Sequence, residues 1–515
     1  MLEKIHAPIA KAMPFVLAFA VGACSSSDLV GADEANNDEH EAEQGDVQQA
    51  LGKEPEEAKS PDREIHRWNG IMLDANALDA LNQPPAVPDQ GGPPRTARAF
   101  AIVQIAVFDA FNAIAGGYRS YTGIEDAARP AAPSAAIAKA AHDTLVALWP
   151  SQRPRFDKEL AEDLARIPNT QAKQNGIDAG RRAAAAILAL RANDGSQIPD
   201  PIVGVNYFPS NKPGKWRPDP VSKIPVALGA FWYKVLPFVI RSNDQFPIAE
   251  PPALTSTQYA REFDEVKRIG GDGKVTPTIR TPEQTFIGIY WGYDGTPFLG
   301  TPPRMMNQIA TVVAKERGTS GLELARLYAL ANVAIADGAL TCWTEKYDED
   351  YWRPVTAIRE ADPGTGPTGK GDGNPATRGD PRWTPLGAPA SNTNRPNFTP
   401  PFPAYTSGHA TFSGAFFQVL RRFYDTDRIG FTFVSDEWNG RTRDNKGNVR
   451  PRIPRSFSSL SQAEDEMGES RIYLGVHWRS DKVWGIRNGR QVANYVYDNA
   501  FRHRSGRDYR DVSSL

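Results

Sequence analysis

Cysteine is nearly absent from this 515-residue chain, which contains only Cys24 and Cys342. Two thiols cannot build a cysteine-rich zinc site, and they do not support a disulfide framework. Neither sign of charge is in excess, because 59 lysines and arginines are mixed with 61 aspartates and glutamates. The composition therefore indicates neither a nucleic-acid surface nor a polybasic membrane surface. A small anion would have to be held by a local cluster of arginine and lysine side chains.

The apolar run near the N-terminus is too short to cross a bilayer. It reads AMPFVLAFAVGA at residues 12–23 and follows Lys4 and Lys11, a pattern typical of a signal peptide over residues 1–23. The sequence VGAC that ends at Cys24 resembles a bacterial lipobox. It implies an exported protein of the bacterial cell envelope, facing the periplasm or in the outer membrane, whose membrane contact is a lipid on Cys24. The alternative is an ordinary secretory signal and a secreted protein.

Aromatic residues are almost missing from the next segment, and acidic residues dominate it. Between Asp28 and Glu64 the chain has thirteen acidic and three basic side chains. Such a segment cannot bury enough apolar surface to offset the entropy of ordering it. Residues 24–64 are therefore predicted to be a disordered acidic linker ahead of a folded part at 65–515.

Strict alternation of apolar and polar residues is scarce, so few or no strands are expected. Apolar residues recur instead at helical spacing, and Pro or Gly interrupts them. We expect a mainly α fold of two packed helical bundles, at 65–270 and 271–515. Helices are predicted over residues 95–115, 133–149 with Ser134 as the N-cap, 179–194, 320–343, 410–425 and 481–501. The stretch 361–403 has ten prolines and seven glycines, which predicts a long loop at the entrance of a site.

Three separated motifs carry side chains that suit one tetrahedral oxyanion. They are KYDEDYWRP at 346–354, SGH at 407–409 and SRIYLGVHWRSD at 470–481. Lysine and arginine supply a point charge and planar forks, a serine donates a hydroxyl, and a glycine lets the backbone approach. The helix expected after SGH would direct its positive end at the same anion. Taken singly, each motif also fits solvated helix ends and caps.

Two histidines complete this set. Asp481 lies four residues after His477, so the carboxylate can accept from one ring nitrogen and leave the other to bond to the central atom of the anion. His409 lies beside the predicted anion site, where an imidazole can move protons near neutral pH.

In this order the three motifs resemble the signature of the vanadium-dependent haloperoxidases and of the type 2 phosphatidic acid phosphatases, which include bacterial acid phosphatases. The resemblance implies helical bundles of this type with the site in the second one. In haloperoxidases the anion is a vanadate cofactor bonded to the histidine that corresponds to His477; in phosphatases the same histidine attacks a phosphate ester. The implied anion-binding residues are Lys346, Arg353, Ser407, Gly408, Arg471 and His477.

Residues outside the signature favour the haloperoxidases. WTEKYDEDYWRP, YWGYDGTPFLGTPPRMMNQIA and PPFPAYTSGHATF resemble stretches of fungal vanadium chloroperoxidases. This resemblance implies Trp343 and Phe402 on the halide side and Asp294 as a carboxylate paired with the anion-binding arginines. In bromide-preferring algal enzymes a histidine replaces the phenylalanine, so Phe402 favours the chloroperoxidase type. Thr406 departs from the proline of those relatives, although Ser407 and His409 of the motif remain.

The sequence therefore predicts a vanadate-dependent haloperoxidase that oxidises chloride, bromide or iodide with hydrogen peroxide. His477 would bind vanadium, His409 would act as the base, and Lys346, Asp294 and Asp481 would support the chemistry. An acid phosphatase with His477 as nucleophile and His409 as general acid remains the alternative. A lipid-anchored helical scaffold with a degenerate site is a third possibility.

Overall fold

The computed structural model describes residues 60–82 and 88–505. The predicted signal peptide, Cys24 and almost all of the predicted acidic linker lie outside these residues. The first described helix, α2, begins at Pro61, four residues before the expected start of the folded part, and Ser60 caps it. The expected division into two bundles at residue 270 stays a prediction.

All six predicted helices are present in the described residues. Four follow the predicted spans closely, whereas α6 begins earlier and α10 extends two turns further, as far as Glu349. Ser134 was predicted as an N-cap, but the helix already begins at Pro133 and Ala132 occupies the cap. Proline suits the first turn of a helix because its missing N–H would have no intrahelical partner there. The bounds are α3 Pro93–Ala115, α4 Pro133–Leu148, α6 Gln171–Leu190, α10 Gly321–Glu349, α12 Gly408–Tyr424 and α14 Arg479–Asn499.

Seven further helices raise the number of α-helices in the described residues to thirteen. Several start at a capping signal, such as the capping box of Thr281 and Gln284 at the start of α8. They are α2 Pro61–Asp79, α5 Arg153–Arg166, α7 Thr257–Ile269, α8 Pro282–Tyr290, α9 Pro302–Glu316, α11 Pro354–Arg359 and α13 Leu460–Tyr473.

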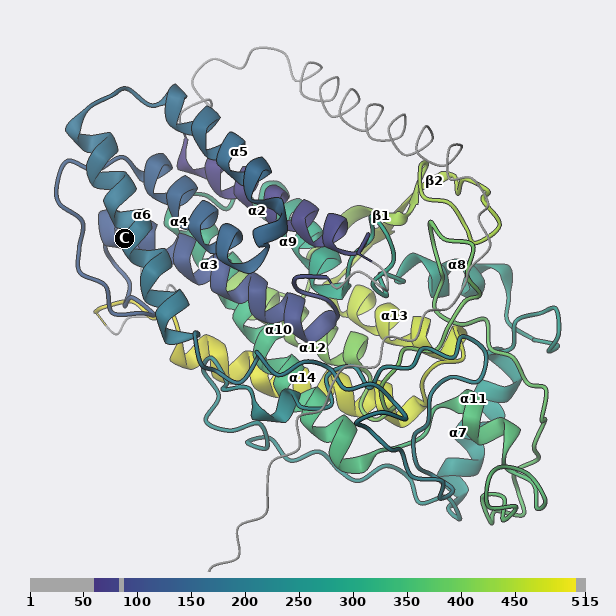
Figure 1. Ribbon diagram of the computed structural model, residues 1–515. Helices are drawn as coiled ribbons and strands as arrows, with labels where there is room; N and C mark the ends of the chain where they lie inside the picture. Colours follow the sequence, from purple (N-terminus) through teal and green to yellow (C-terminus); the bar gives the residue numbers. More distant parts are fainter. Residues whose placement is uncertain (1–59, 83–87, 506–515) are drawn as a thin grey trace, which may run out of the picture. The chain divides into compact units, whose positions relative to one another are not determined.

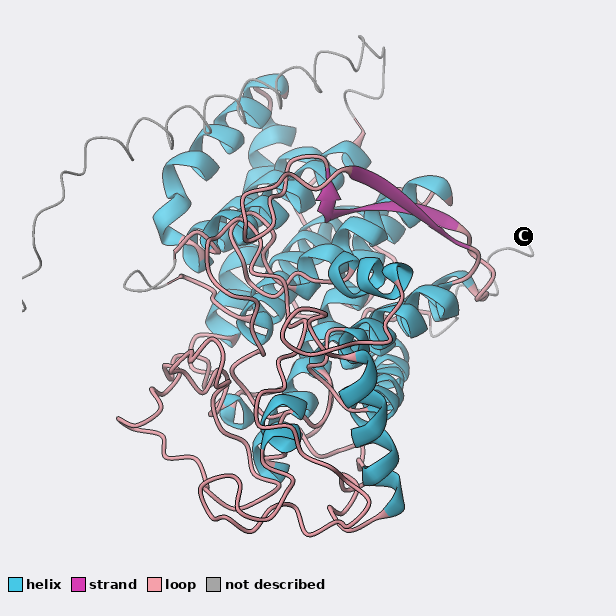
Figure 2. Ribbon diagram, turned by 90° about the vertical axis from the view of Figure 1, so that its right-hand side faces the viewer, coloured by secondary structure: helices cyan, strands magenta, loops and turns pink. Residues whose placement is uncertain are grey.

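One antiparallel hairpin, β1 Phe431–Asn439 and β2 Arg452–Phe457, is the sheet of the described residues. Phe431 pairs with Phe457 and Asn439 with Arg452, and the register is irregular between Val434 and Asn439. Figure 2 shows the hairpin as two magenta arrows among the cyan helices. The mainly α prediction is thus confirmed.

The centre of the described residues is a group of long helices. Helix α10 packs against α3 on one side and against α12 and α14 on the other, and α12 packs along α14 (Figure 1). Nearly every α10 side chain from Leu324 to Trp343 is buried. Helix α3 is long and apolar enough to cross a membrane by composition, but 94% of its most apolar window is buried inside the fold. It is therefore the core helix of this packed group.

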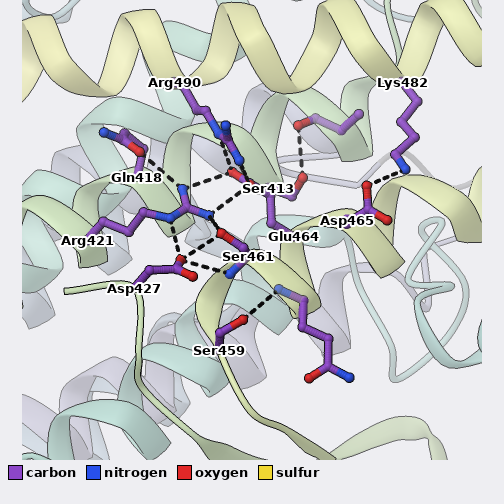
Figure 3. A network of polar contacts seen from close by, with 12 residues as sticks. Ser413, Gln418, Arg421, Asp427, Ser459, Ser461, Glu464, Asp465, Lys482 and Arg490 are labelled. Carbon is purple, nitrogen blue, oxygen red and sulfur yellow. Dashed lines mark hydrogen bonds and ion pairs between the residues drawn. The ribbon is translucent and has the colours of Figure 1, made fainter.

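An ion-pair network joins the three C-terminal helices. Glu464 on α13 is 1% exposed and accepts from Arg421 on α12 and from Arg490 on α14, while Asp427 also pairs with Arg421 (Figure 3). Helices α12, α13 and α14 carry the second and third sequence motifs at or near their ends. The network ties these helices to one another, because the buried Glu464 carboxylate on α13 pairs with one arginine from α12 and one from α14.

The predicted loop at 361–403 has no helix or strand of its own, and backbone hydrogen bonds attach it to the fold at several points. Leu386 donates to the carbonyl of Gly270, Gly387 donates to Leu474, and Asp380 donates to Ile358. The last residues of the loop, Pro400 and Phe402, line the cavity described below.

Candidate active site

The N-terminus of α12 forms the floor of the site. Ser407 is the N-cap, and its hydroxyl accepts from the backbone N–H of Ala410 at 3.4 Å. Gly408 is the first helical residue, and a Cβ placed there would lie 3.0 Å from the ring of Trp343. A side chain would not fit at this position without displacing the indole. The positive end of the helix is therefore directed into the site at a point where the backbone can be approached closely.

Lys346 lies in the last turn of α10 and is fully buried. Its ammonium donates to the carbonyls of Pro403 and Ala404, both at 3.0 Å, and to that of Thr406. These bonds point the amine at the turn before α12. Burial, together with the charge of Arg353, lowers the pKa of Lys346 from 10.5 to about 7. An anion beside it would favour the charged form.

Arg353 is the N-cap residue of α11, where Pro354 begins the helix. Its Nε donates to the carbonyl of Phe402 at 2.9 Å, and its Nη1 donates to that of Val476 at 2.7 Å. Nη2 is buried and has no hydrogen-bond partner. Burial lowers the pKa of this arginine to about 9.

Arg471 comes from the last turn of α13 and forms a two-pronged ion pair with Asp294. Its Nη2 and Nη1 lie 2.8 and 3.1 Å from the two carboxylate oxygens, and the guanidinium is fully buried. This bidentate geometry leaves the orientation of the arginine little freedom. Its Nε is buried and has no hydrogen-bond partner.

His477 and Asp481 form a buried pair at the start of α14. Nδ1 of the imidazole donates to Oδ2 of Asp481 at 2.7 Å, and Nε2 accepts from Nη1 of Arg353 at 2.9 Å. Burial and the nearby cations lower the pKa of His477 well below 6.5, so the ring is neutral. Burial raises the pKa of Asp481 to about 7. The pair presents the lone pair of Nε2 to the cationic side of the site.

His409 lies in the first turn of α12 and is 6% exposed. Its Nε2 donates to the carbonyl of Gly292 at 2.8 Å, so Nδ1 carries the lone pair of the neutral ring. Burial and the charge of Arg471 lower its pKa to about 4. His409 is thus neutral at pH 7 and can accept a proton at Nδ1.

Two aromatic rings form an apolar side of the site. The rings of Trp343 and Phe402 lie 5.0 Å apart between centroids, and each is at most 6% exposed. The Lys346 ammonium and the Arg353 guanidinium each lie 5.0 Å from the centre of the Phe402 ring. The carbonyl of Leu228 accepts from the indole N–H at 3.2 Å. The result is a dry wall bordered by positive charge.

Several of these side chains line one small cavity of about 10 Å³. Arg471 and Asp294 line it, Lys346 and Arg353 are buried close by, and Nη2 of Arg353 and Nε of Arg471 have no hydrogen-bond partner. Buried donors of this kind are costly unless an acceptor satisfies them. The arrangement therefore suits a bound oxyanion. Its lining includes Pro93, Asp294, Pro302, Trp343, Pro400, Phe402, Gly408, His409, Phe412, Arg471 and His477.

The structure brings the predicted site residues of all three motifs together, along with Asp294, Trp343 and Phe402. Thr406, the departure from the related sequences, offers its carbonyl to Lys346, and its hydroxyl lies 3.5 Å from the Cys342 sulfur. Sequence reasoning missed Gly292, whose carbonyl holds His409 from 117 residues away. No local spacing signals such a backbone acceptor. Cys24 lies outside the described residues.

A larger open groove between α7 and Arg479 contains none of the site side chains. Among the described residues no three His, Cys, Asp or Glu side chains group as a cation site.

Comparisons with known proteins agree on the class of this site. A family model described as the VCPO second helical-bundle domain matches residues 326–506, which include all three motifs, Trp343 and Phe402, but not Gly292 or Asp294. Vanadium chloroperoxidase from Curvularia inaequalis is 33% identical, over 83% of this chain and 80% of its own length.

Two solved structures share the fold. The crystal structure of a bacterial vanadium-dependent iodoperoxidase matches with a TM-score of 0.65 and 25% identity, over 86% of this chain and 97% of that one. An apo-type bacterial vanadium-dependent chloroperoxidase matches with a TM-score of 0.59 and 18% identity, over 78% and 92%.

Proposed function

We propose that this chain, which belongs to the vanadium chloroperoxidase family, oxidises halide with hydrogen peroxide and releases hypohalous acid. Membership of this family makes the chain an enzyme of the vanadium haloperoxidase class. The proposal of this reaction rests on one observation above all: Nη2 of Arg353 and Nε of Arg471 are buried without partners, and Arg353 also contacts the neutral Nε2 of His477 through Nη1.

The cofactor is vanadate. The residues present fit it, because an oxyanion would satisfy Nη2 of Arg353 and Nε of Arg471 and would compensate the three buried cations. When bound, vanadium(V) supplies a Lewis acid that activates peroxide without changing oxidation state. We assign its oxygens to Lys346, Arg353, Ser407, Gly408 and Arg471, and its vanadium to His477.

His477 is suited to a metal-ligand role by the group behind it. The carboxylate of Asp481, 2.7 Å from Nδ1, fixes the tautomer and increases the basicity of Nε2. Nε2 now accepts from Arg353, so a bound anion would take over this contact.

His409 is the residue that moves the proton. The Gly292 carbonyl holds its Nε2–H, which leaves the Nδ1 lone pair free to remove a proton from hydrogen peroxide. Its pKa of about 4 keeps the ring unprotonated before the reaction. Asp294 acts through Arg471, which it holds in place by two hydrogen bonds.

The halide approaches along the Trp343 and Phe402 wall. These buried rings exclude water, and the positive charges of Lys346 and Arg353 over the Phe402 ring attract an anion. Lys346 would also stabilise the negative charge that develops on the peroxide oxygen left behind when halide attacks. Phe402 favours chloride as a substrate in addition to bromide and iodide.

One assay tests the function and its alternative. Purified protein, with and without orthovanadate, is supplied with peroxide, each halide and a dye that halogenation bleaches, and separately with a phosphate ester. We expect halogenation that depends on vanadate. Ester hydrolysis that vanadate inhibits would instead identify the phosphatase, and the absence of both activities would identify a degenerate site.

We also propose export and lipid attachment at Cys24. The support is the VGAC sequence after the apolar run. Expression in a bacterium with a labelled fatty acid should label the protein and place it in the membrane fraction, whereas Cys24→Ser should do neither. Labelling that persists in the variant would contradict this assignment.

A further inference from the structure

The turn at Tyr290–Asp294 joins both functional halves of the site. Its Gly292 carbonyl holds His409, and its Asp294 carboxylate holds Arg471. Between them, Tyr293 has a φ of 57°, in the left-handed region that side chains other than glycine rarely adopt. Such a conformation persists only where the surroundings impose it.

Strand β1 supplies those surroundings with consecutive residues. Ser435 donates its hydroxyl to the carbonyl of Tyr290 at 2.6 Å. The backbone N–H of Asp436 donates to the hydroxyl of Tyr293 at 2.7 Å. The third residue, Glu437, has a fully buried side chain and lies directly behind Gly292.

The Glu437 carboxyl contacts Gly292 so closely that a Cβ at that glycine would lie 2.5 Å from Oε1. The other oxygen, Oε2, accepts from Ser391 Oγ at 2.6 Å and from Arg450 Nη1 at 2.5 Å. Oε1 itself has no hydrogen-bond partner. The carboxyl is thus clamped from one side and presents its other side to the backbone of the turn.

We propose that Glu437 is a positioning residue of the active site. Its carboxyl is held by Ser391 and Arg450 and packs against Gly292, and this contact keeps the Gly292 carbonyl hydrogen-bonded to His409. Its effect reaches the chemistry through the tautomer of His409. With the carbonyl in place, Nε2 carries the proton and Nδ1 the lone pair. If the turn moves away, this constraint is lost and both tautomers become accessible.

The consequence for turnover rests on the proposed function, whereas the positioning itself does not. Ser391 belongs to the long proline- and glycine-rich loop and Arg450 to the connection between β1 and β2. Ser391 and Arg450 therefore act on the site through Glu437.

The test is the tautomer of His409, read from the nitrogen chemical shifts of protein labelled with ¹⁵N-histidine. The His409 signals are assigned by their loss in His409→Gln. The parent should show a single Nε2–H tautomer. Glu437→Ala should show a mixture of tautomers, and Glu437→Gln, which keeps the shape and an acceptor for Ser391 and Arg450, should restore the parent signals. An unchanged tautomer in Glu437→Ala would overturn the proposal.

Glu464→Ala is the matched control, because Glu464, like Glu437, is a buried carboxylate paired with arginine, here with Arg421 and Arg490 (Figure 3). It should lower the melting temperature by a similar amount and leave the His409 tautomer unchanged. If this variant showed the same mixture of tautomers as Glu437→Ala, the Glu437 effect would reflect only a general loss of stability of the fold, and the proposal would be overturned.

Gly292→Ala provides a second route if Glu437→Ala does not fold. The added methyl would push the turn away from the intact carboxyl and from Pro389, because a Cβ on Gly292 would lie 2.9 Å from Pro389 Cγ. We expect the same mixture of tautomers. A spectrum like that of the parent would contradict the positioning role of Glu437. In the vanadate-loaded enzyme Glu437→Ala should lower halide turnover at least tenfold. If the parent has no such activity, the proposed function fails. The tautomer measurement still tests the positioning role of Glu437, because it does not depend on turnover.

Discussion

The two sides of the site hold their histidines with different groups. On the α14 side a carboxylate four residues away, Asp481, accepts from His477. On the α12 side a neutral backbone carbonyl, that of Gly292, accepts from His409. A carboxylate strengthens the free nitrogen of the ring as a ligand, whereas a carbonyl fixes the tautomer and leaves the ring weakly basic. The difference fits the proposed division of roles, in which the His477 side retains the anion and the His409 side moves the proton.

Removing the ligand side should have the largest effect. In His477→Ala the site loses the nitrogen that we propose as the vanadium ligand, and Arg353 loses a partner. We expect vanadate affinity to fall by more than about 100-fold, since losing even an outer partner of a metal ligand costs about 10- to 100-fold. Equilibrium dialysis with vanadium analysis measures this loss. Full halide oxidation by this variant would contradict the assignment of His477.

Removing the proton side should slow turnover and spare binding. His409→Ala leaves Lys346, Arg353, Arg471 and His477 in place, so vanadate should stay bound. We expect kcat to fall by about 10²- to 10⁴-fold, the usual contribution of a general base. Dialysis and steady-state halogenation on the same preparation separate the two effects. If vanadate were lost as completely as in His477→Ala, the two sides would not differ as described.

The two sides also differ in what the sequence could predict. Lys346, Arg353 and the SGH and SRIYLGVHWRSD motifs were recognisable because fixed spacings place their side chains, and His477 and Asp481 lie one helical turn apart. Asp294 followed only from the resemblance to related sequences. Gly292 and Glu437 gave no signal, because one contributes a backbone carbonyl and the other acts through a tertiary contact with a turn 145 residues earlier in the chain.

The fold shows the same limit. The long apolar helices, such as α3 and α10, were predictable from periodicity, whereas α7 and α13 were missed because their composition is polar and tertiary packing stabilises them. Strand β1 was missed too, although its buried residues do alternate.

Lys346 should give a smaller, pH-dependent effect. Burial lowers its pKa from 10.5 to about 7, so between those values the unfolded chain binds a proton that the anion-free fold does not. The buried charge destabilises the fold fully below about pH 7, and this penalty is relieved as the pH rises toward 10.5. A bound oxyanion favours the charged amine, and binding therefore takes up a proton above pH 7.

Vanadate affinity should accordingly fall as the pH rises above about 7, by up to about tenfold per pH unit. Dialysis across this range measures the slope. Lys346→Gln cannot titrate, so it should bind more weakly at low pH and with a flatter profile. Comparison of the two profiles removes the titration of vanadate itself. Parallel profiles would show that Lys346 does not change its charge when the anion binds.

The smallest effect should come from a change at Phe402, in the apolar side of the site that it forms with Trp343. Phe402 is buried, and the positive charges of Lys346 and Arg353 each lie 5.0 Å from the centre of its ring. Phe402→His replaces this dry face by a polar ring that draws in water. Chloride holds its hydration shell more tightly than bromide, so the loss of the apolar face should cost chloride oxidation more. We expect kcat/KM to fall by about tenfold for chloride, equivalent to roughly 1.4 kcal/mol, and by less for bromide.

Vanadate dialysis is the control, because the variant keeps every residue assigned to the anion. Equal losses for the two halides would remove Phe402 from halide selection and make the Trp343 and Phe402 contact simple packing.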